Sequence, residues 1–393
     1  MSDTLIPVYP PLETEALRRS RGPGYPFAEP GLSFTHLGRG AVWLALRRLG
    51  VGEGSRVAMP AYHCGAEVEA VRLSGAEIEW YRVDEDLGVD VEDLERATRE
   101  SDVAYVISHF GFPMPPLPEG VPVIEDAAHA LFSEDAEGRP LGSRGDAAIF
   151  CPRKSLGVPD GGALLVRERG GSSNGHSLAA SHAFAQPLRP RPQGRRILRS
   201  SVSLLAGRGA LARPAPIRRA ATALIARASK GDAAARAGNV TEVIIGEWDL
   251  EVADMENAAR RPARLTETIS TRVDPVATRS RRRANYLRLL ADLGEFVPSR
   301  YQDLPELTAP LYLPVRAPDR PAAMRTLLDH GVRALEIWPV PHPLLPREQF
   351  PHLDWARDDL VALPVHQQLR DEHVDLVLAA AQAALSGRRP PPG

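Results

Sequence analysis

The sequence predicts an α/β protein in which helices cover a large, mainly parallel β-sheet, followed by a smaller α+β domain. Through residues 38–166, short apolar runs typical of strands alternate with stretches typical of amphipathic helices. Beyond about residue 260, helices are mixed with few strands, which indicates a second unit. The chain has 393 residues and is 43% hydrophobic, so it is long enough for a large core and for two or three structural units.

The alternating part of the chain gives the expected order of elements. Apolar runs predict strands at residues 56–59, 76–83, 103–108, 121–125, 147–150 and 163–166. Helices are predicted at residues 41–48, 67–73 and 91–98. The first follows Gly38-Arg39-Gly40 and ends at Gly50, and the third is capped by Asp90. Ligands of open parallel sheets bind at the carboxyl ends of the strands, so we expect a site there.

The last third of the chain is predicted to form a smaller domain. Helices are predicted at residues 279–293, 319–330 and 371–385, and a strand at 360–365. Asp319 as a cap, Pro321 in the first turn and Gly331 after the last turn delimit the middle helix. We therefore expect an N-terminal arm at residues 1–30, a large domain at 31–260 and a small C-terminal domain at 261–393.

An arginine-rich insertion is expected at about residues 170–240 of the large domain. It combines a Gly- and Ser-rich loop, a basic segment interrupted by prolines, and short helical patterns. A basic amphipathic helix can contact a membrane surface or an anionic ligand. A solvated insertion or an arm that packs in a dimer is the alternative.

Composition excludes several classes of protein. A formal net charge of -2 gives no reason to expect nucleic-acid binding. No run reaches the roughly 18 apolar residues of a membrane span, and residues 1–15 lack the apolar core of a signal peptide. Cys64 and Cys151 are too few for a disulfide framework or a structural zinc site. We expect a cytoplasmic protein without a metal site.

Lys154 is unusual because almost every basic side chain of this sequence is an arginine. Of 48 Lys and Arg residues, only Lys154 and Lys230 are lysines. A lysine amine can lose its proton near pH 7 when it is desolvated and can then add to a carbonyl, which a guanidinium cannot do. Lys154 lies on a short connection between two predicted strands. Chance in an arginine-biased sequence is the alternative explanation.

Four residues in order suggest a cofactor site. Gly40 lies at a helix start, Asp126 at a strand end, His129 just after it, and Lys154 after the next strand. Pyridoxal 5'-phosphate (PLP) requires a lysine for its aldehyde, a carboxylate for its pyridine nitrogen, and backbone donors at a helix N-terminus for its phosphate. Each residue alone has a simpler interpretation: Asp126 as a helix cap, and His129 as a hydrogen-bonded histidine in a helix.

The chain resembles the DegT-type sugar aminotransferases, which are PLP enzymes of fold type I, from about residue 32 to residue 385. The matching stretches are GRGAVWLALRRLGVGEGSRV at 38–57, PAYHC at 60–64, IEDAAHA at 124–130, GSRGDAAIF at 142–150, KSLGVPDGG at 154–162, RRRANY at 281–286 and LPVH at 363–366. The resemblance implies a fold type I PLP-transferase, with PLP as the cofactor.

The resemblance also implies roles for the residues around the cofactor ring. Lys154 falls at the position of the family's Schiff-base lysine, and Asp126 at that of the partner of the pyridine nitrogen. His129 takes the position of a Gln or His beside the ring hydroxyl. Cys64 sits where many members have an aromatic residue that stacks on the ring, so stacking must come from elsewhere or be weaker.

Further roles concern the phosphate and the substrate. Arg39 and Gly40 occupy the phosphate-binding turn. Cys151 lies where a serine often donates to the phosphate, and a thiol is a poorer donor. The run that ends at Lys154 is two residues shorter than in typical members. His342 resembles a histidine at the substrate entrance.

The resemblance implies an aminotransferase that moves an amino group from an amino acid, with glutamate as the expected donor, to a keto-sugar. We expect the sugar to be nucleotide-linked, the pathway to make surface polysaccharide or natural products, and the protein to be a homodimer with shared active sites. The main alternative keeps PLP but changes the reaction to elimination or other chemistry at an amino-acid Cα, in natural-product assembly. It is motivated by Cys64 and the shortened run.

A non-catalytic scaffold and a dinucleotide-binding enzyme both have less support from the sequence. A scaffold with this fold but without catalysis is disfavoured because Lys154 and Asp126 are intact. A dinucleotide-binding α/β enzyme is disfavoured because no G-x-G-x-x-G motif follows the first strand.

Overall fold

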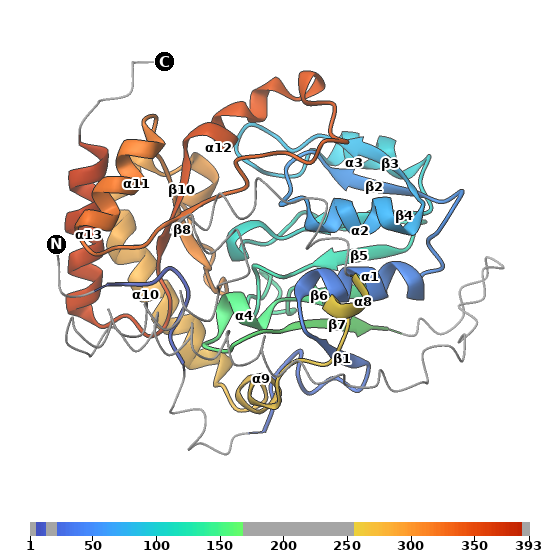
Figure 1. Cartoon of the computed structure of the whole chain (residues 1–393), viewed down its shortest axis with the longest axis horizontal. Coiled ribbons are helices and arrows are strands. Elements are labelled where there is room, and N and C mark those ends of the chain that lie inside the picture. The colour runs from blue at the N-terminus through green and yellow to red at the C-terminus, as the bar shows by residue number, and fades with distance from the viewer. Residues whose placement is uncertain (1–4, 13–21, 168–254, 387–393) are drawn as a thin grey trace, which may run out of the picture.

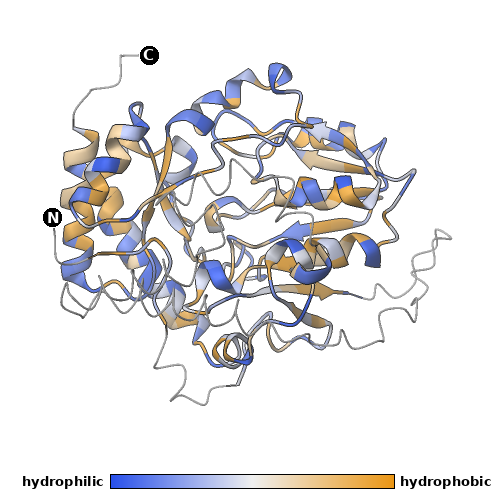
Figure 2. Cartoon of the chain, in the orientation of Figure 1, coloured by the Kyte–Doolittle hydropathy of each residue, from blue (hydrophilic) through white to orange (hydrophobic). Residues whose placement is uncertain are grey.

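The chain forms a large sheet and a small sheet, each with helices packed on it (Figure 1). The computed structural model describes residues 5–12, 22–167 and 255–386. The insertion expected at about 170–240 lies outside the described residues. Apolar residues concentrate along the strands of the large sheet and in the C-terminal helix (Figure 2).

Seven strands form the large sheet of the described chain. They are β1 (Leu32–Thr35), β2 (Arg56–Pro60), β3 (Glu77–Tyr81), β4 (Val103–Ile107), β5 (Val123–Asp126), β6 (Ala147–Phe150) and β7 (Gly162–Val166). Their order is β1-β7-β6-β5-β4-β2-β3. The pairs from β3 to β6 are parallel, whereas β7 is antiparallel to both β6 and β1. The connection from β6 to β7 holds only residues 151–161, too few for the crossover that a parallel pair requires.

Helices cover both faces of this sheet, as predicted. α1 (Gly38–Arg48) and α2 (Ala66–Ser74) pack on the face that carries Val57, Met59 and Tyr105. α3 (Val91–Thr98) packs on the opposite face with the alternate strand residues Ala58 and Ala104. α1 begins at Gly38 rather than at the predicted residue 41, so Gly38, Arg39 and Gly40 form its first turn. Two short helices, α4 (Pro152–Ser155) and α8 (Met255–Ala258), complete this part.

The small sheet is antiparallel, with the order β8-β10-β9. Its strands are β8 (Tyr312–Arg316), β9 (Leu335–Glu336) and β10 (Leu360–Pro364). The helices of this part are α9 (Arg264–Ser270), α10 (Pro275–Leu293), α11 (Arg320–Asp329), α12 (Asp354–Asp359) and α13 (Asp371–Leu385). α10, α11 and α13 lie together beside β8 and β10 (Figure 1). Among the helices of the described ranges, none is long and apolar enough to cross a membrane.

The described N-terminal residues pack on the C-terminal part of the chain. Ile6 N donates to Gly331 O at 2.7 Å, and Arg333 N donates to Ile6 O at 2.9 Å. Tyr9 then contacts Tyr312 of β8, with ring centroids 6.1 Å apart. The N-terminal segment therefore packs beside the small sheet.

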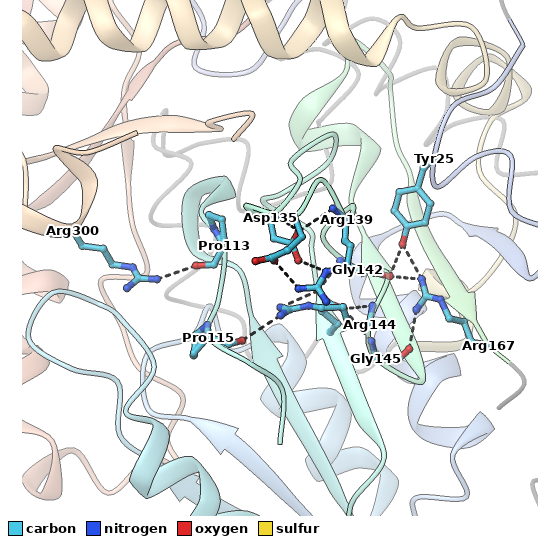
Figure 3. Close-up of polar contacts among 12 residues, drawn as sticks. Tyr25, Pro113, Pro115, Asp135, Arg139, Gly142, Arg144, Gly145, Arg167 and Arg300 are labelled. Atoms are coloured by element: carbon cyan, nitrogen blue, oxygen red, sulfur yellow. Dashed lines mark hydrogen bonds and ion pairs between the residues drawn. The ribbon is translucent and has the colours of Figure 1, made fainter. Parts of the chain in front are cut away.

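Several arginines donate hydrogen bonds to loop carbonyls, which gives a structural reason for the excess of arginine over lysine. Arg167 Nη1 donates to Gly145 O at 2.8 Å, and Arg300 Nη2 donates to Pro113 O at 3.0 Å (Figure 3). Arg144 Nη1 donates to Pro115 O at 3.5 Å in the same region. A guanidinium supplies five donors in one plane, so it can satisfy several carbonyls at once, whereas an ammonium is a compact point charge.

A methyl group at Gly40 is predicted to disrupt the packing of α8 on α1. A Cβ at Gly40 would lie 2.1 Å from Ala258 O and 2.5 Å from Ala259 N, which are backbone atoms. Gly40→Ala should lower the free energy of unfolding by about 1–3 kcal/mol, measured by urea denaturation. Gly38→Ala is the matched control, because its Cβ would meet Cys151 Sγ at an ordinary 3.6 Å. Equal stability of the two variants would contradict the prediction.

Candidate active site

The carboxyl ends of β2, β4, β5 and β6 lie at one edge of the sheet because these strands are parallel. Cys64, His109 and Lys154 lie in the segments after β2, β4 and β6, while Asp126 ends β5 and His129 follows it. Electrostatic interactions link Lys154 with Cys64, Asp126 and His129, so these side chains lie within electrostatic range of the lysine.

Asp126 is a buried carboxylate at the end of β5, with 9% of its surface exposed. Its Oδ2 accepts a hydrogen bond from Tyr105 OH at 2.5 Å, and its Oδ1 accepts one from Ala128 N at 2.8 Å. Burial raises the pKa of Asp126, and the Tyr105 hydrogen bond and the Lys154 charge only partly oppose that rise. Glu125 faces the other way and accepts hydrogen bonds from Gly142 N and Gly145 N.

Lys154 lies on the single turn of α4. Burial alone would lower the pKa of Lys154, but the nearby Cys151, Cys64, Tyr9 and Asp126 outweigh it, and the pKa is raised. Asp126 is the carboxylate among these neighbours of Lys154.

His129 lies in the turn after β5 and not in a helix, which corrects the simpler interpretation of this residue. Its ring lies between Phe110 and Trp338, with centroid distances of 5.9 Å and 5.3 Å. Burial, followed by the charge of Lys154, lowers the pKa of His129 well below its usual value. Nδ1 accepts a hydrogen bond from Phe110 N at 3.4 Å, so the neutral ring carries its proton on Nε2.

Cys64 pairs with a carboxylate that the sequence did not single out. Its Sγ donates to Glu67 Oε2 at 2.8 Å, and Cys64 N donates to Glu67 Oε1 at 2.9 Å. Burial and the negative charge of Glu67 raise the pKa of the Cys64 thiol well above its usual value. Burial and the charge of Asp126 also raise the pKa of Glu67. This thiol is therefore neutral and oriented, and the only sequence signal for the pair is its spacing of three residues.

The first turn of α1 lies beside Cys151, as the predicted phosphate site requires. Gly38 adjoins Cys151 Sγ, no side chain caps α1, and no acidic residue lies in its first turn. Arg39 and Gly40 belong to the same turn, so its backbone donors suit an anion. Cys151 is buried, and its thiol donates to Gly161 O at 3.4 Å. The backbone of α1 is therefore a better candidate for a phosphate ligand than this thiol.

His342 is 4% exposed and contacts Glu69 of α2. Its Nε2 is 3.0 Å from Glu69 Oε2, and its Nδ1 accepts a hydrogen bond from Leu344 N at 3.2 Å. Glu69 also binds Arg72 through both oxygens. His342 therefore ties the proline-rich segment after β9 to the large sheet.

Trp338 is a site residue that sequence reasoning missed. It is half-buried, and its ring contacts those of Tyr62, His109 and His129. Its φ of 45° lies in the left-handed region, which is unfavourable for a bulky side chain. The buried guanidinium of Arg357 donates to the carbonyls of Trp338 and Ala61 and so holds this conformation. No pattern in the sequence reveals contacts that join such distant segments.

These features fit PLP, the cofactor expected from the sequence. The Lys154 amine, the buried Asp126 carboxylate and the uncapped N-terminus of α1 supply the three kinds of group that the cofactor requires. The fold is that of the fold type I PLP-dependent enzymes, and the predicted fold class is confirmed. Among the described residues, no group of three or more His, Cys, Asp or Glu side chains is placed to hold a metal ion.

Comparisons with known proteins find similarity over part of the chain. Residues 35–170 match the model of the DegT/DnrJ/EryC1/StrS aminotransferase family. The resemblance that the motifs predicted is therefore confirmed over this segment, which includes Asp126 and Lys154. It is 33% identical over 140 residues to a UDP-N-acetyl-3-dehydro-alpha-D-glucosamine 3-aminotransferase from Acidithiobacillus ferrooxidans. That match covers 33% of this chain and 38% of the relative's length.

Solved structures match over almost the whole chain. The PLP form of Spr1654 from Streptococcus pneumoniae has a TM-score of 0.62 at 17% identity, covering 97% of this chain and 99% of that one. The sugar aminotransferase CalS13 from Micromonospora echinospora has a TM-score of 0.58 at 17% identity, covering 96% and 100%. The shared fold extends over the small sheet as well as the large one.

Removing the charge of Asp126 should stabilise the protein without cofactor. The raised pKa means that folding disfavours the carboxylate, so stability is lost as pH rises from about 4 through the folded-state pKa. Asp126→Asn should raise the melting temperature at pH 7.5 by roughly 1–4 °C, and this gain should shrink as pH falls toward about 4.

Asp135→Asn is the control, because its melting temperature should change in the opposite direction. Burial raises the pKa of Asp135, but hydrogen bonds from Arg139 outweigh it, and the pKa is lowered. Its carboxylate therefore contributes stability above about pH 4, which is lost as pH falls through the lowered value. This variant should melt at a lower temperature at pH 7.5. A lower melting temperature for Asp126→Asn as well would contradict the burial argument.

Proposed function

We propose that this protein is a PLP-dependent aminotransferase that moves an amino group from an amino acid to a keto-sugar. The observation that carries the proposal is the convergence of Lys154 and the buried Asp126 at the carboxyl edge of the large sheet. The family match over residues 35–170 supports the same reaction. When bound, PLP supplies an electron sink that makes a proton on the adjacent substrate carbon acidic.

The side chains of the site have separate roles in this proposal. Lys154 carries the cofactor, and its freed Nζ takes a proton from the substrate carbon and returns one. Asp126 keeps a proton on the pyridine nitrogen opposite its carboxylate. Tyr105 and Ala128 N fix the two oxygens of Asp126, so the carboxylate cannot rotate. His129 is neutral and clamped between two rings, which orients its Nε2 proton as a donor toward the ring hydroxyl of the cofactor.

The first turn of α1 binds the phosphate in this proposal. Arg39 and Gly40 lie in that turn, and its backbone N–H groups together with the helix dipole favour a dianion. Cys64 lies beside Lys154 as a neutral thiol held by Glu67. His342 orders the substrate entrance through its link to α2.

The proposed substrates follow from the relatives. The acceptor is a nucleotide-linked keto-sugar, because the curated relative with 33% identity is named for one. Glutamate is the proposed donor, and the pathway is that of a surface polysaccharide or a natural product. We place the enzyme in the cytoplasm as a homodimer whose subunits share the active sites. Sedimentation velocity tests the dimer.

A second candidate function is elimination or other chemistry at the Cα of an amino acid. The Cys64–Glu67 pair favours it, because it places a thiol and a carboxyl group beside Lys154 where many relatives have a ring. Parallel incubations without acceptor, one with glutamate and one with an amino acid that carries a leaving group at Cβ, separate the two. Transfer leaves the amino group on the cofactor and releases 2-oxoglutarate in a single stoichiometric burst, whereas elimination releases ammonia over repeated turnovers of an amino acid that carries a leaving group.

Lys154→Arg is predicted to abolish transfer, with a loss of at least about 1,000-fold in kcat, because a guanidinium cannot form or break the link to the cofactor. Borohydride reduction followed by mass spectrometry should find PLP on the Lys154 peptide of the wild type and on no peptide of the variant. Arg153→Lys is the control, since it adds an amine next to the site without replacing Lys154. Cofactor on another lysine of the Lys154→Arg protein would refute the assignment.

A further inference from the structure

Lys154 lies on an element that cannot fix its own position. α4 has four residues, and a helix this short is not stable by itself. Its terminal carbonyl groups have no partners within the helix and need donors from elsewhere. The direction of the Lys154 side chain therefore depends on what binds the backbone around it.

The carbonyl of Ser155, the residue that follows Lys154, is bound by two side chains from the C-terminal half. Arg282 Nη2 donates to Ser155 O at 2.8 Å, and Gln367 Nε2 donates to it at 3.2 Å. Arg282 lies in α10, and Gln367 lies in the segment between β10 and α13. The last carbonyl of α4 is thus held by groups far away in the sequence.

The two donors are also bound to each other. Arg282 Nε donates to Gln367 Oε1 at 2.8 Å, and Arg282 Nη1 donates to Pro310 O at 3.3 Å. Arg282 is 1% exposed, so these bonds form in a region shielded from water, where they are stronger and where a missing partner would be costly. One planar guanidinium thereby joins α4, the loop before β8 and the segment after β10.

We infer that Arg282, supported by Gln367, is a positioning residue that sets the direction of the Lys154 amine by fixing the Ser155 carbonyl. The inference rests on the proposed function, in which Lys154 carries the cofactor and transfers protons. Arg282→Lys would keep the positive charge but could not bind Ser155 O, Gln367 Oε1 and Pro310 O at the same time. A loss of activity in this variant would therefore come from geometry and not from charge alone. A misplacement of about 1 Å at a reacting group can lower a rate about 100-fold.

The test compares four variants of the full chain loaded with PLP. Arg282→Met removes the guanidinium, and Arg282→Lys keeps its charge. Gln367→Leu removes only the second donor to Ser155 O. Arg281→Met is the matched control on the same helix, because Arg281 binds Leu369 O at 2.7 Å and not the Lys154 turn. The readouts are kcat and KM for amino transfer, the pH titration of the absorbance of the lysine-bound cofactor, and the melting temperature.

We expect kcat to fall about 10- to 100-fold in Arg282→Met and Arg282→Lys, and about 3-fold in Gln367→Leu, with KM changed less. The midpoint of the absorbance titration should shift in the same three variants and not in Arg281→Met. Should Arg282→Met fail to fold, Arg282→Lys and Gln367→Leu still give the comparison.

Wild-type kcat and an unshifted titration in Arg282→Lys and Gln367→Leu would overturn the inference. A fall in melting temperature without either change would show a structural role only and would also overturn it. Failure of the wild type to bind PLP at Lys154 would instead reject the proposed function, so the two failures are distinguishable.

Discussion

The site depends on a carboxylate that folding buries at the end of β5. Burial disfavours the charge of Asp126, and the surrounding structure offsets this with hydrogen bonds from Tyr105 and Ala128 N and with the charge of Lys154. These groups come from β4, from the turn after β5 and from α4. The parallel order of the strands is therefore the condition for the whole arrangement. Such a cluster of charge lowers stability in the absence of a ligand, as functional sites commonly do.

Arginine and lysine have different tasks in this protein. Arg282, Arg357 and Arg167 bind backbone carbonyls that connect segments distant in the sequence. Through these contacts the C-terminal half holds both the Lys154 turn and the Trp338 carbonyl, so the small sheet takes part in shaping the site. Lys154 contributes an amine where a guanidinium would be chemically useless for carbonyl chemistry.

Much of the fold could be predicted because its strands are apolar and its helices are bounded by clear signals. α3 and α13 have their predicted ends, and Asp90 and Asp319 cap their helices as expected. β8 was not predicted because Pro314 lies within it, which an edge strand tolerates and a central strand does not. β9 was missed because it has only two residues. α10 begins earlier than predicted, at Pro275 behind the cap of Asp274.

The sequence by itself determined the mainly parallel α/β fold, the family resemblance, and the candidate pair of Asp126 and Lys154, because periodicity and the order of motifs are local properties of a chain. Only the tertiary structure decided the direction of the Lys154 pKa shift, the pairing of Cys64 with Glu67, the stacking of Trp338 on His129, and the hydrogen bond from Arg282 to the Ser155 carbonyl. Each of these depends on distances between segments of the folded chain, and burial sets the strength of each charge interaction. The order of residues in the sequence gives neither these distances nor the burial.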